Sequence, residues 1–329
     1  MTQYTRSIRK AAECLRAGGT VAFATETVIG IGADAGNERA VTGIFKAKGR
    51  PADNPLIVHL HDVNQIGQVA RRLPAAAETL IAACSPGPLS VIVPKAAGLS
   101  PLVTAGLDTV AIRFPAHAVA QEFLAACAVP VAAPSANRSG RPSPTTWRAV
   151  REDLDGRLDA VLALGRVQHG IESTVVDCSC SPPVLLRAGS VGVERLRELV
   201  PRLRLMREGM VGAARSPGMK YRHYAPRAEV RLVTRPEEID PAVAVRAGYL
   251  GLSRPPSVLS FRRRKVFDSL EAYARDLYRL FRNFDDDGVS VIFCQTVPSG
   301  GIGLALGDRL ARAAAGHPIV RPGSGKSPG

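Results

Sequence analysis

A basic stretch without apolar periodicity, residues 201–226, divides the 329-residue chain into two parts. It contains five arginines and one lysine, interspersed with prolines and glycines. Both flanking parts alternate patterns typical of helices and strands. A connection of this length without secondary structure is either a linker or a functional loop. The sequence therefore predicts two α/β units rather than one large domain.

The first unit, residues 1–202, mixes short apolar strands with amphipathic helices. We expect helices at residues 3–16, 37–46, 73–84, 116–127 and 193–199. We expect strands at residues 20–24, 56–60, 89–93, 110–114, 130–133, 160–164, 173–177 and 184–186. Asn37 is a typical helix N-cap, and Gly49 lies where the helix that follows Asn37 should end. This mixture predicts an α/β domain of about 200 residues.

The second unit, residues 229–321, shows a similar pattern on a smaller scale. An apolar segment, a helix capped by Ser269, a strand and a closing helix are expected at 242–252, 269–284, 289–294 and 303–315. Residues 203–228 are predicted to form the linker. Residues 322–329 are rich in proline, glycine and serine, which predicts a frayed tail.

Composition excludes several classes of protein. Hydrophobic residues make up 46% of the chain and charged residues 22%, which argues against extensive disorder, collagen and coiled coil. No apolar run approaches the ~18 residues that span a membrane, and the first residues do not resemble a secretory signal. The six cysteines do not fit common zinc spacings, so we expect reduced thiols in a cytoplasmic protein.

The net charge of +14 is concentrated in one region. Positions 200 to 282 contain 18 basic and 8 acidic residues. Arginine outnumbers lysine 36 to 7, a bias that a GC-rich genome can also produce. Charge alone does not choose among a nucleic acid, a membrane surface and an anionic small molecule.

The segment 46–59 could contribute to a phosphate site. Lys48 and Arg50 lie at the expected end of a helix, where two cations can converge on one phosphate group. Asn54 precedes a proline, which favours an extended backbone, and His59 lies in an apolar strand. Each of these residues, taken alone, is more often an ordinary surface or strand residue.

The loop 133–146 offers small hydrogen-bonding groups at the carboxyl end of a predicted strand. These groups are Ser135, Asn137, Ser139 and Ser143. Ligands of open α/β sheets gather at such strand ends, and small hydroxyls suit phosphate or ribose oxygens. The alternative is an ordinary surface loop rich in turn-forming residues.

Two arginines interrupt apolar strands. Arg113 lies in TVAIRFP and Arg187 in LLRAG, while Ser173 opens another apolar strand. A buried arginine is costly unless it is paired or binds a carboxylate or phosphate, although either strand could instead present it at an outward-facing edge. The sequence contains no P-loop, no GxSxG and no HExxH. Cations and hydroxyls without a clear nucleophile favour phosphoanhydride chemistry by positioning and charge stabilisation.

These segments together resemble one family. ATETVIGIGADA, KGRPADNPLIVH, TVAIRFPAH, VAAPSANRSGRPSPT, ESTVVD and LLRAG occur in the order and spacing of the YrdC-like domain. SPGMKYRHYAP and GIGLALGDRLARAA resemble the linker and closing segment of its two-domain form. The resemblance covers essentially the whole chain. It implies a twisted mixed sheet with flanking helices, followed by a smaller Rossmann-like α/β domain.

The resemblance implies a threonylcarbamoyl-AMP synthase, a nucleotidyltransferase. Such an enzyme joins L-threonine, bicarbonate and ATP into threonylcarbamoyl-AMP and pyrophosphate, with magnesium accompanying the phosphates. The product would pass to the transferase machinery that forms threonylcarbamoyladenosine in tRNA. A weak contact with tRNA is compatible with this interpretation, and no membrane partner is expected.

The resemblance also assigns site residues. The catalytic group would be Lys48, Arg50, Ser135 and Asn137. L-threonine would contact Thr27, His59, Arg113, the main chain of Ala133, and Ser173. ATP would contact Arg50, Asn54, Thr109, Ser135, Ser143, Arg187 and Tyr224. No protein ligands for a metal are expected.

Tyr224 belongs to the linker, so we expect residues 216–226 to fold over the cleft as a lid, with the second domain as its anchor. The alternative is a tether whose tyrosines pack at the domain interface. The chain departs from the family's usual residues at Ala24, Ile29, Ser85 and Ala188. Ile29 replaces a usual tyrosine near the expected threonine pocket.

Two other functions are compatible with parts of the pattern. The basic surface would suit an RNA-binding module, but such modules usually need stacking aromatics, which are only 5% of this chain. A carbamoyl-transfer maturation factor can share the YrdC-like domain, but it carries zinc-finger and acylphosphatase-like segments that this sequence lacks.

Overall fold

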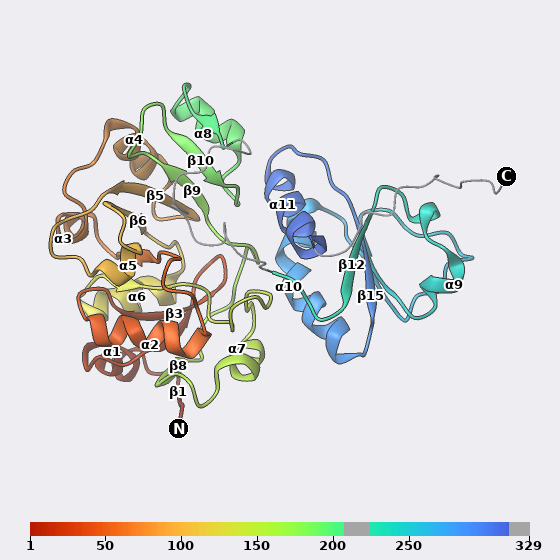
Figure 1. The fold of residues 1–329 in the computed structure, drawn as a ribbon, viewed down its shortest axis with the longest axis horizontal. Helices are drawn as coiled ribbons and strands as arrows, with labels where there is room; N and C mark the ends of the chain where they lie inside the picture. Colours follow the sequence, from red (N-terminus) through yellow and green to blue (C-terminus); the bar gives the residue numbers. More distant parts are fainter. Residues whose placement is uncertain (207–223, 316–329) are drawn as a thin grey trace.

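The structure, a computed structural model, describes residues 1–206 and 224–315 and contains two sheets (Figure 1). The first sheet has the strand order β1-β8-β2-β3-β7-β4-β6-β5-β9-β10-β11. The strands are β1 (Gln3–Thr5), β2 (Val21–Ala24), β3 (Ile29–Asp34), β4 (Ile57–His59), β5 (Leu89–Pro94), β6 (Thr109–Arg113), β7 (Val131–Ala132), β8 (Ala160–Leu162), β9 (Thr174–Asp177), β10 (Val184–Arg187) and β11 (Arg204–Leu205). Strand β4 pairs parallel with β6 and antiparallel with β7, so the predicted mixed sheet is confirmed.

Helices flank this sheet. They are α1 (Ile8–Arg16), α2 (Glu38–Lys48), α3 (Ile66–Val69), α4 (Ala75–Cys84), α5 (Pro101–Thr104), α6 (Ala118–Cys127), α7 (Trp147–Leu154) and α8 (Val193–Leu199). The predicted ends of α2 are confirmed by their geometry. The side chain of Asn37 accepts a hydrogen bond from the amide of Ala40, and Gly49 ends the helix with a φ of 61°. Glycine adopts this left-handed conformation at little cost.

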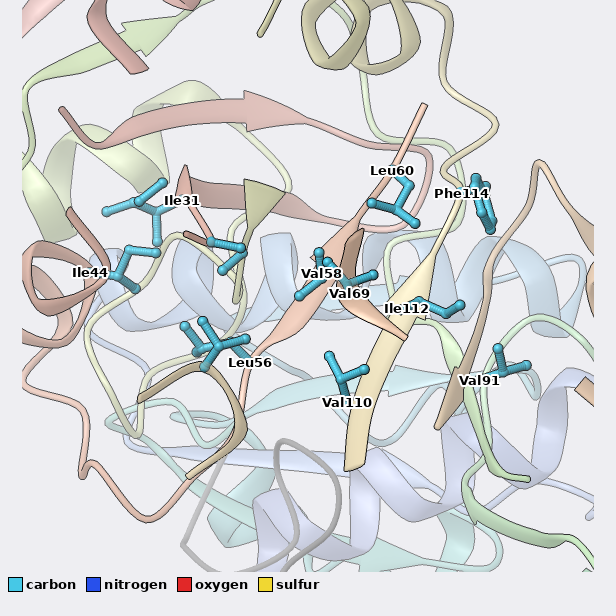
Figure 2. Packing of buried hydrophobic residues seen from close by; sticks show 14 of the residues in the cluster. Ile31, Ile44, Leu56, Val58, Leu60, Val69, Val91, Val110, Ile112 and Phe114 are labelled. Carbon is cyan, nitrogen blue, oxygen red and sulfur yellow. The ribbon is translucent and has the colours of Figure 1, made fainter. Parts of the chain in front are cut away.

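The hydrophobic core of the first domain comprises two main clusters. In β2, Val21 and Phe23 belong to the cluster that includes residues of α1 and α6, whereas Ala22 and Ala24 belong to the other cluster. Alternation of this kind follows from the two-residue period of a strand. Figure 2 shows the larger cluster, in which side chains of β3, β4, β6 and β5 pack with that of Ile44 from α2. The core therefore supports the central strands whose ends form the site.

The second domain is built on a parallel sheet in the order β12-β15-β13-β14. Its strands are β12 (Glu229–Val233), β13 (Gly248–Gly251), β14 (Arg263–Val266) and β15 (Val291–Gln295). Its helices are α9 (Pro241–Ala244), α10 (Leu270–Asp286) and α11 (Ile302–Ala314). Figure 1 shows α10 and α11 on the side of this domain that faces the first domain. Parallel strands with packed helices agree with the predicted Rossmann-like arrangement.

Several elements differ from the sequence prediction. The helix expected from Gln3 begins at Ile8, because residues 3–5 pair with β8 and Ser7 caps the helix. Strand β3 and helix α7 were not predicted. Strand β11 pairs with the edge of β10, although the sequence places its residues in the linker. An unpaired sheet edge offers hydrogen-bonding groups to a neighbouring segment, which explains this extension.

No helix within residues 1–206 and 224–315 is long and apolar enough to cross a membrane. All six cysteines are free thiols. The predicted tail, residues 322–329, lies outside the described residues.

Candidate active site

A cleft with about 640 Å³ of empty space, including its open mouth, lies where several strands of the large sheet end. Eleven of the fourteen predicted site residues line it: Thr27, Arg50, His59, Arg113, Ala133, Ser135, Asn137, Ser143, Ser173, Arg187 and Tyr224. They come from segments far apart in the sequence. The remaining three, Lys48, Asn54 and Thr109, do not line the cleft.

The end of β6 places a fixed cation in the cleft. Arg113 is 4% exposed, and its Nη1 donates to Oγ1 of Thr27 at 2.9 Å. Its Nη2 donates to Oε1 of Glu26 at 2.7 Å. Glu26 was not predicted as a site residue, although it lies between two threonines in the TET string. Its carboxylate fixes the orientation of the arginine that the sequence assigned to the threonine carboxylate.

Electrostatics beside Arg113 favour an ionised glutamate and a neutral histidine. Burial raises the pKa of Glu26, but the charge and hydrogen bond of Arg113 outweigh this effect and lower it overall. Burial, together with the charge of Arg113, lowers the pKa of His59 to about 3. His59 pairs with Arg113 across β4 and β6. At neutral pH its imidazole can therefore donate or accept a hydrogen bond without adding charge.

Hydrogen bonds connect Arg187, which was assigned to ATP, with Ser173, which was assigned to L-threonine. The Nη2 of Arg187 donates to Oγ of Ser173 at 3.1 Å, and its Nε donates to the carbonyl oxygen of Ser173 at 3.0 Å. The hydroxyls of Ser173 and Ser90 lie 2.8 Å apart. Burial lowers the pKa of Arg187. A residue assigned to ATP thus directly orients one assigned to threonine.

Lys48 supports the loop after β7 from outside the cleft. Its Nζ donates to the main-chain carbonyls of Ser135 and Asn137, the second at 2.6 Å. Burial and the charge of Arg50 lower its pKa well below the usual value. The Oγ of Ser135 in turn donates to Oδ1 of Asn137 at 2.5 Å. In this structure Lys48 holds the Ser-x-Asn turn in place.

The segment after α2 contains two other predicted ATP residues, Arg50 and Asn54. The guanidinium of Arg50 donates to the carbonyl oxygens of Asn54 and Pro55, at 3.2 and 2.9 Å. Burial lowers the pKa of Arg50 to about 10. Asn54 is 1% exposed, and neither polar atom of its side chain has a hydrogen-bond partner within the described residues. Thr109 lies at the opposite end of β6 from Arg113.

The second domain reaches the wall of the cleft. Glu172 lines the cleft and accepts hydrogen bonds from Ser143 at 2.6 Å, from Tyr278 of α10 at 3.1 Å and from Arg309 of α11 at 2.9 Å. The ring of Tyr224 stacks on that of Tyr278, with centroids 5.6 Å apart. Glu172, Tyr278 and Arg309 were not predicted as site residues, although Glu172 opens the ESTVVD string.

Tyr224 has a left-handed backbone with a φ of 73°, and its side chain is 6% exposed. A non-glycine residue in this conformation stores on the order of 1–3 kcal/mol of strain, which packing must offset. Tyr224 both lines the cleft, as the lid interpretation expects, and packs on Tyr278 of the second domain, as the tether interpretation expects. Residues 216–223 of the predicted lid lie outside the described residues.

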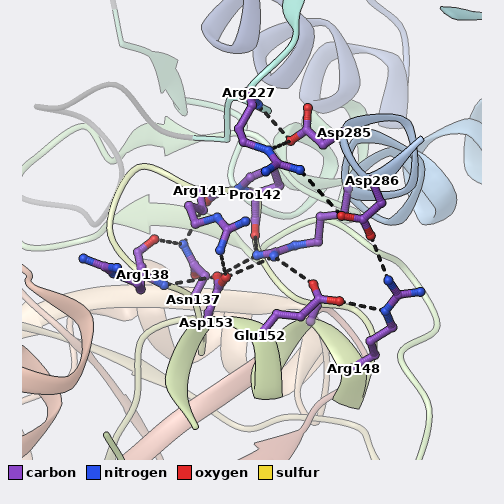
Figure 3. Close-up of polar contacts among 12 residues, drawn as sticks. Asn137, Arg138, Arg141, Pro142, Arg148, Glu152, Asp153, Arg227, Asp285 and Asp286 are labelled. Carbon is purple, nitrogen blue, oxygen red and sulfur yellow. Dashed lines mark hydrogen bonds and ion pairs between the residues drawn. The ribbon is translucent and has the colours of Figure 1, made fainter. Parts of the chain in front are cut away.

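A second group of ion pairs connects the loop after β7 to α10 (Figure 3). The carboxylate of Asp153 in α7 accepts hydrogen bonds from the backbone amide of Arg138 and the side chain of Arg141. It also accepts one from the buried guanidinium of Arg282 in α10. Arg282 also donates to the carbonyl oxygen of Pro142. Arg148 of α7, whose side chain is exposed, pairs with Asp286 of α10 (Figure 3). The loop with Ser135 and Ser143 is therefore supported from both domains.

Ile29, one of the departures from the family's usual residues, does not itself line the cleft. Ile29 is 1% exposed and pairs with Ala24 across β2 and β3, whereas its neighbours Val28 and Gly30 line the cleft.

In the described part of the chain, no three histidine, cysteine or acidic side chains form a group suited to a metal ion.

Comparisons with known proteins give matches to both domains. Residues 13–189 match the family model described as "Telomere recombination", and residues 191–315 match the one described as "Threonylcarbamoyl-AMP synthase, C-terminal domain". The threonylcarbamoyl-AMP synthase of Pyrococcus abyssi is 41% identical, with 95% of each chain covered. That of Bacillus subtilis is 42% identical, over 95% of this chain and 94% of the relative.

Solved structures agree with these matches. The crystal structure of P. abyssi Sua5 complexed with L-threonine superposes with a TM-score of 0.90 at 39% identity, covering 97% of this chain and 99% of the other. The crystal structure of E. coli YciO matches with a TM-score of 0.52 at 20% identity. It covers 57% of this chain and 96% of its own, and shares the fold alone.

Proposed function

The chain belongs to the threonylcarbamoyl-AMP synthase family, and from this premise we propose how its cleft performs the reaction. The protein is a transferase that makes threonylcarbamoyl-AMP, with ATP as a substrate. One observation carries the assignment of the cleft. Eleven residues that the resemblance assigned to L-threonine, ATP or the catalytic group line a single cavity in a chain that aligns with named synthases over 95% of its length.

L-threonine binds at the end of β6 in this proposal. The guanidinium of Arg113, oriented by Glu26, binds the substrate carboxylate, since an arginine fork suits a carboxylate. Thr27, Ser173, the neutral His59 and the main chain of Ala133 complete the pocket. The structure of a P. abyssi relative complexed with L-threonine supports L-threonine as the ligand.

The triphosphate of ATP lies towards Arg50 and Arg187. Both guanidinium groups border the cleft, where they can neutralise the charge that develops as pyrophosphate leaves. Ser135 and Ser143 offer hydroxyls, and Tyr224 offers a ring and a hydroxyl for the nucleotide. Asn54 and Thr109 lie outside the cleft lining, so their contacts with ATP would require the segments that hold them to move.

The proposed reaction has two steps. The amine of threonine attacks bicarbonate, and water leaves to give a carbamate. A carbamate oxygen then attacks the α-phosphorus of ATP, the bond to the β-phosphate breaks, and pyrophosphate departs. The residues of this chain contribute orientation and charge stabilisation rather than a covalent nucleophile. A magnesium ion would arrive with the phosphates, because Mg²⁺ is commonly held by substrate phosphates and water.

The proposal includes a place in the cytoplasm, where ATP and tRNA are both present, and transfer of the product to the enzyme that modifies tRNA. The RNA-binding module without catalysis is less favoured, because near full-length relatives are named as synthases. Any tRNA contact would use the basic surface and would weaken steeply with added salt.

An omission assay tests this proposal. Pyrophosphate release is measured with the full chain and all three substrates, then with threonine, bicarbonate or ATP left out in turn. We expect release only in the complete mixture. Equal release without threonine would indicate simple ATP hydrolysis and would contradict the proposal.

A further inference from the structure

We propose that Arg309, in the second domain, is a positioning residue for the ATP side of the cleft. The inference rests on the proposed function, since it concerns the same ATP site. It assigns to the second domain a role beyond anchoring the linker. Arg309 is 0% exposed, and its contacts reach three residues that the sequence assigned to ATP: Ser143, Arg187 and Tyr224.

The first contact acts through Glu172. The Nε of Arg309 donates to Oε2 of Glu172 at 2.9 Å, while Ser143 donates to Oε1 of the same carboxylate at 2.6 Å. The position of the Ser143 hydroxyl therefore depends on a carboxylate that the second domain holds. Tyr278 donates to Oε2 at 3.1 Å, so both helices facing the first domain contribute.

The second contact reaches Arg187 through the neighbouring backbone, and the third is made directly with Tyr224. The Nη2 of Arg309 donates at 2.9 Å to the carbonyl oxygen of Ala188, the residue that follows Arg187. Its guanidinium lies over the ring of Tyr224, 5.3 Å from the ring centre. A cation over an aromatic face stabilises the ring in one position. One side chain thus contacts the backbone after β10 and the linker residue Tyr224.

The negative charge of Glu172 explains why a buried cation is needed beside it. Glu172 lines the cleft into which a triphosphate must enter, and an uncompensated buried carboxylate there would repel it. Burial raises the pKa of Glu172, but the charges of Arg309 and Arg187 and the Ser143 hydrogen bond lower it overall. Of the two arginines, Arg309 has the larger effect on the Glu172 carboxylate, so the second domain supplies most of the positive charge that compensates it.

The test compares Arg309→Met, Glu172→Gln and the double variant with the wild-type chain. We expect Arg309→Met to raise the KM for ATP about tenfold or more, the loss expected for one charged hydrogen bond, and to change the KM for threonine far less. The double variant should recover much of the ATP affinity, because the uncompensated negative charge is gone. Glu172→Gln alone should perturb ATP use less than Arg309→Met.

Two further variants separate positioning from domain attachment. Arg148→Gln removes the exposed pair with Asp286 across the same interface and should leave both KM values unchanged. Arg282→Met removes the buried pair with Asp153, and Glu172→Gln should not rescue it. If Arg309 only joined the domains, Arg309→Met would lower stability and affect both substrates equally, and Glu172→Gln would not rescue it. That result would overturn the inference.

The outcomes also separate this inference from the proposed function. If the wild-type chain released no threonine-dependent pyrophosphate, the function itself would be wrong. If the wild type were active and Arg309→Met kept its KM for ATP, only the inference would fail. Should Arg309→Met not fold, Arg309→Lys keeps the charge but loses the two-pronged contact with Glu172 and Ala188. It should still raise the KM for ATP selectively, and an unchanged value would overturn the inference.

Discussion

Arg113 shows how one buried charge serves both stability and binding. Its guanidinium is shared between Glu26 and Thr27, so part of it is already paired before any substrate enters. A buried ion pair contributes little net stability, but removing one partner leaves the other charge uncompensated. The two roles can therefore be separated by changing the partners in turn.

We predict that Arg113→Ala weakens threonine binding by about 1.5–3 kcal/mol, the usual value of a hydrogen bond to a charged group, and affects ATP binding much less. The same variant should lose about 3–5 kcal/mol of stability, because Glu26 is left buried and ionised. Glu26→Gln in the same chain should restore stability but not threonine binding. Calorimetric titration and thermal unfolding measure the two effects, and equal losses for both substrates would contradict the assignment.

The lowered pKa of His59 predicts that the free energy of unfolding decreases at acidic pH. Its pKa is lowered from 6.5 to about 3 in the folded chain, so the unfolded chain binds a proton in this range that the folded chain does not. The stabilisation is complete above pH 6.5 and is lost as pH falls towards 3. By pH 5 the loss should reach about 2 kcal/mol.

His59→Gln should flatten the curve of unfolding free energy against pH between 6.5 and 5, as measured by chemical denaturation at several pH values. Some slope should remain, because burial also lowers the pKa of His117 and of His169. An unchanged slope would show that the imidazole of His59 is not held neutral by its surroundings.

At the scale of elements, the loop before β9 depends on a close approach to α10. Gly170 has a φ of 77°, and a Cβ there would lie 2.2 Å from the carbonyl oxygen of Arg275. Both the backbone conformation and the space therefore require glycine. This contact brings Glu172, two residues later, against the helix that carries Tyr278.

We predict that Gly170→Ala destabilises the chain by several kcal/mol, well beyond the ~1 kcal/mol typical of a left-handed conformation at a non-glycine residue. Gly156→Ala is the matched control, because Gly156 has a similar φ of 74° but a Cβ added there would meet no atom within 4 Å beyond its chain neighbours. Thermal unfolding of both variants separates the steric cost from the conformational cost. Equal melting temperatures would show that the contact with α10 is not tight.

Local signals predicted the elements best where capping residues were clear. Asn37 and Ser269 cap α2 and α10 as expected, and α8 spans the predicted residues. Strand β3 was missed because its two glycines weaken the strand pattern, although both lie in a central, buried strand. The two-residue β11 has no pattern of its own and exists because β10 offers an edge.

At the scale of the whole molecule, only those cleft residues that lie within the family's sequence motifs could be predicted. Those motifs contained the residues that line the cleft, including Arg113 and Arg187 in apolar strands. They gave no indication that Arg309 would meet Glu172, because 137 positions separate the two residues. Contacts between domains depend on how the domains pack, and a local pattern does not encode that.

The central claim is that one cleft joins threonine, bicarbonate and ATP. The most direct measurement is mass spectrometry of the reaction mixture after incubation of the full chain with all three substrates, using isotope-labelled bicarbonate. We expect a new adenylate with the mass of threonylcarbamoyl-AMP, carrying the label in its carbamoyl carbon and absent when threonine is omitted. An adenylate without the label, or AMP and pyrophosphate with no adenylate at all, would contradict it.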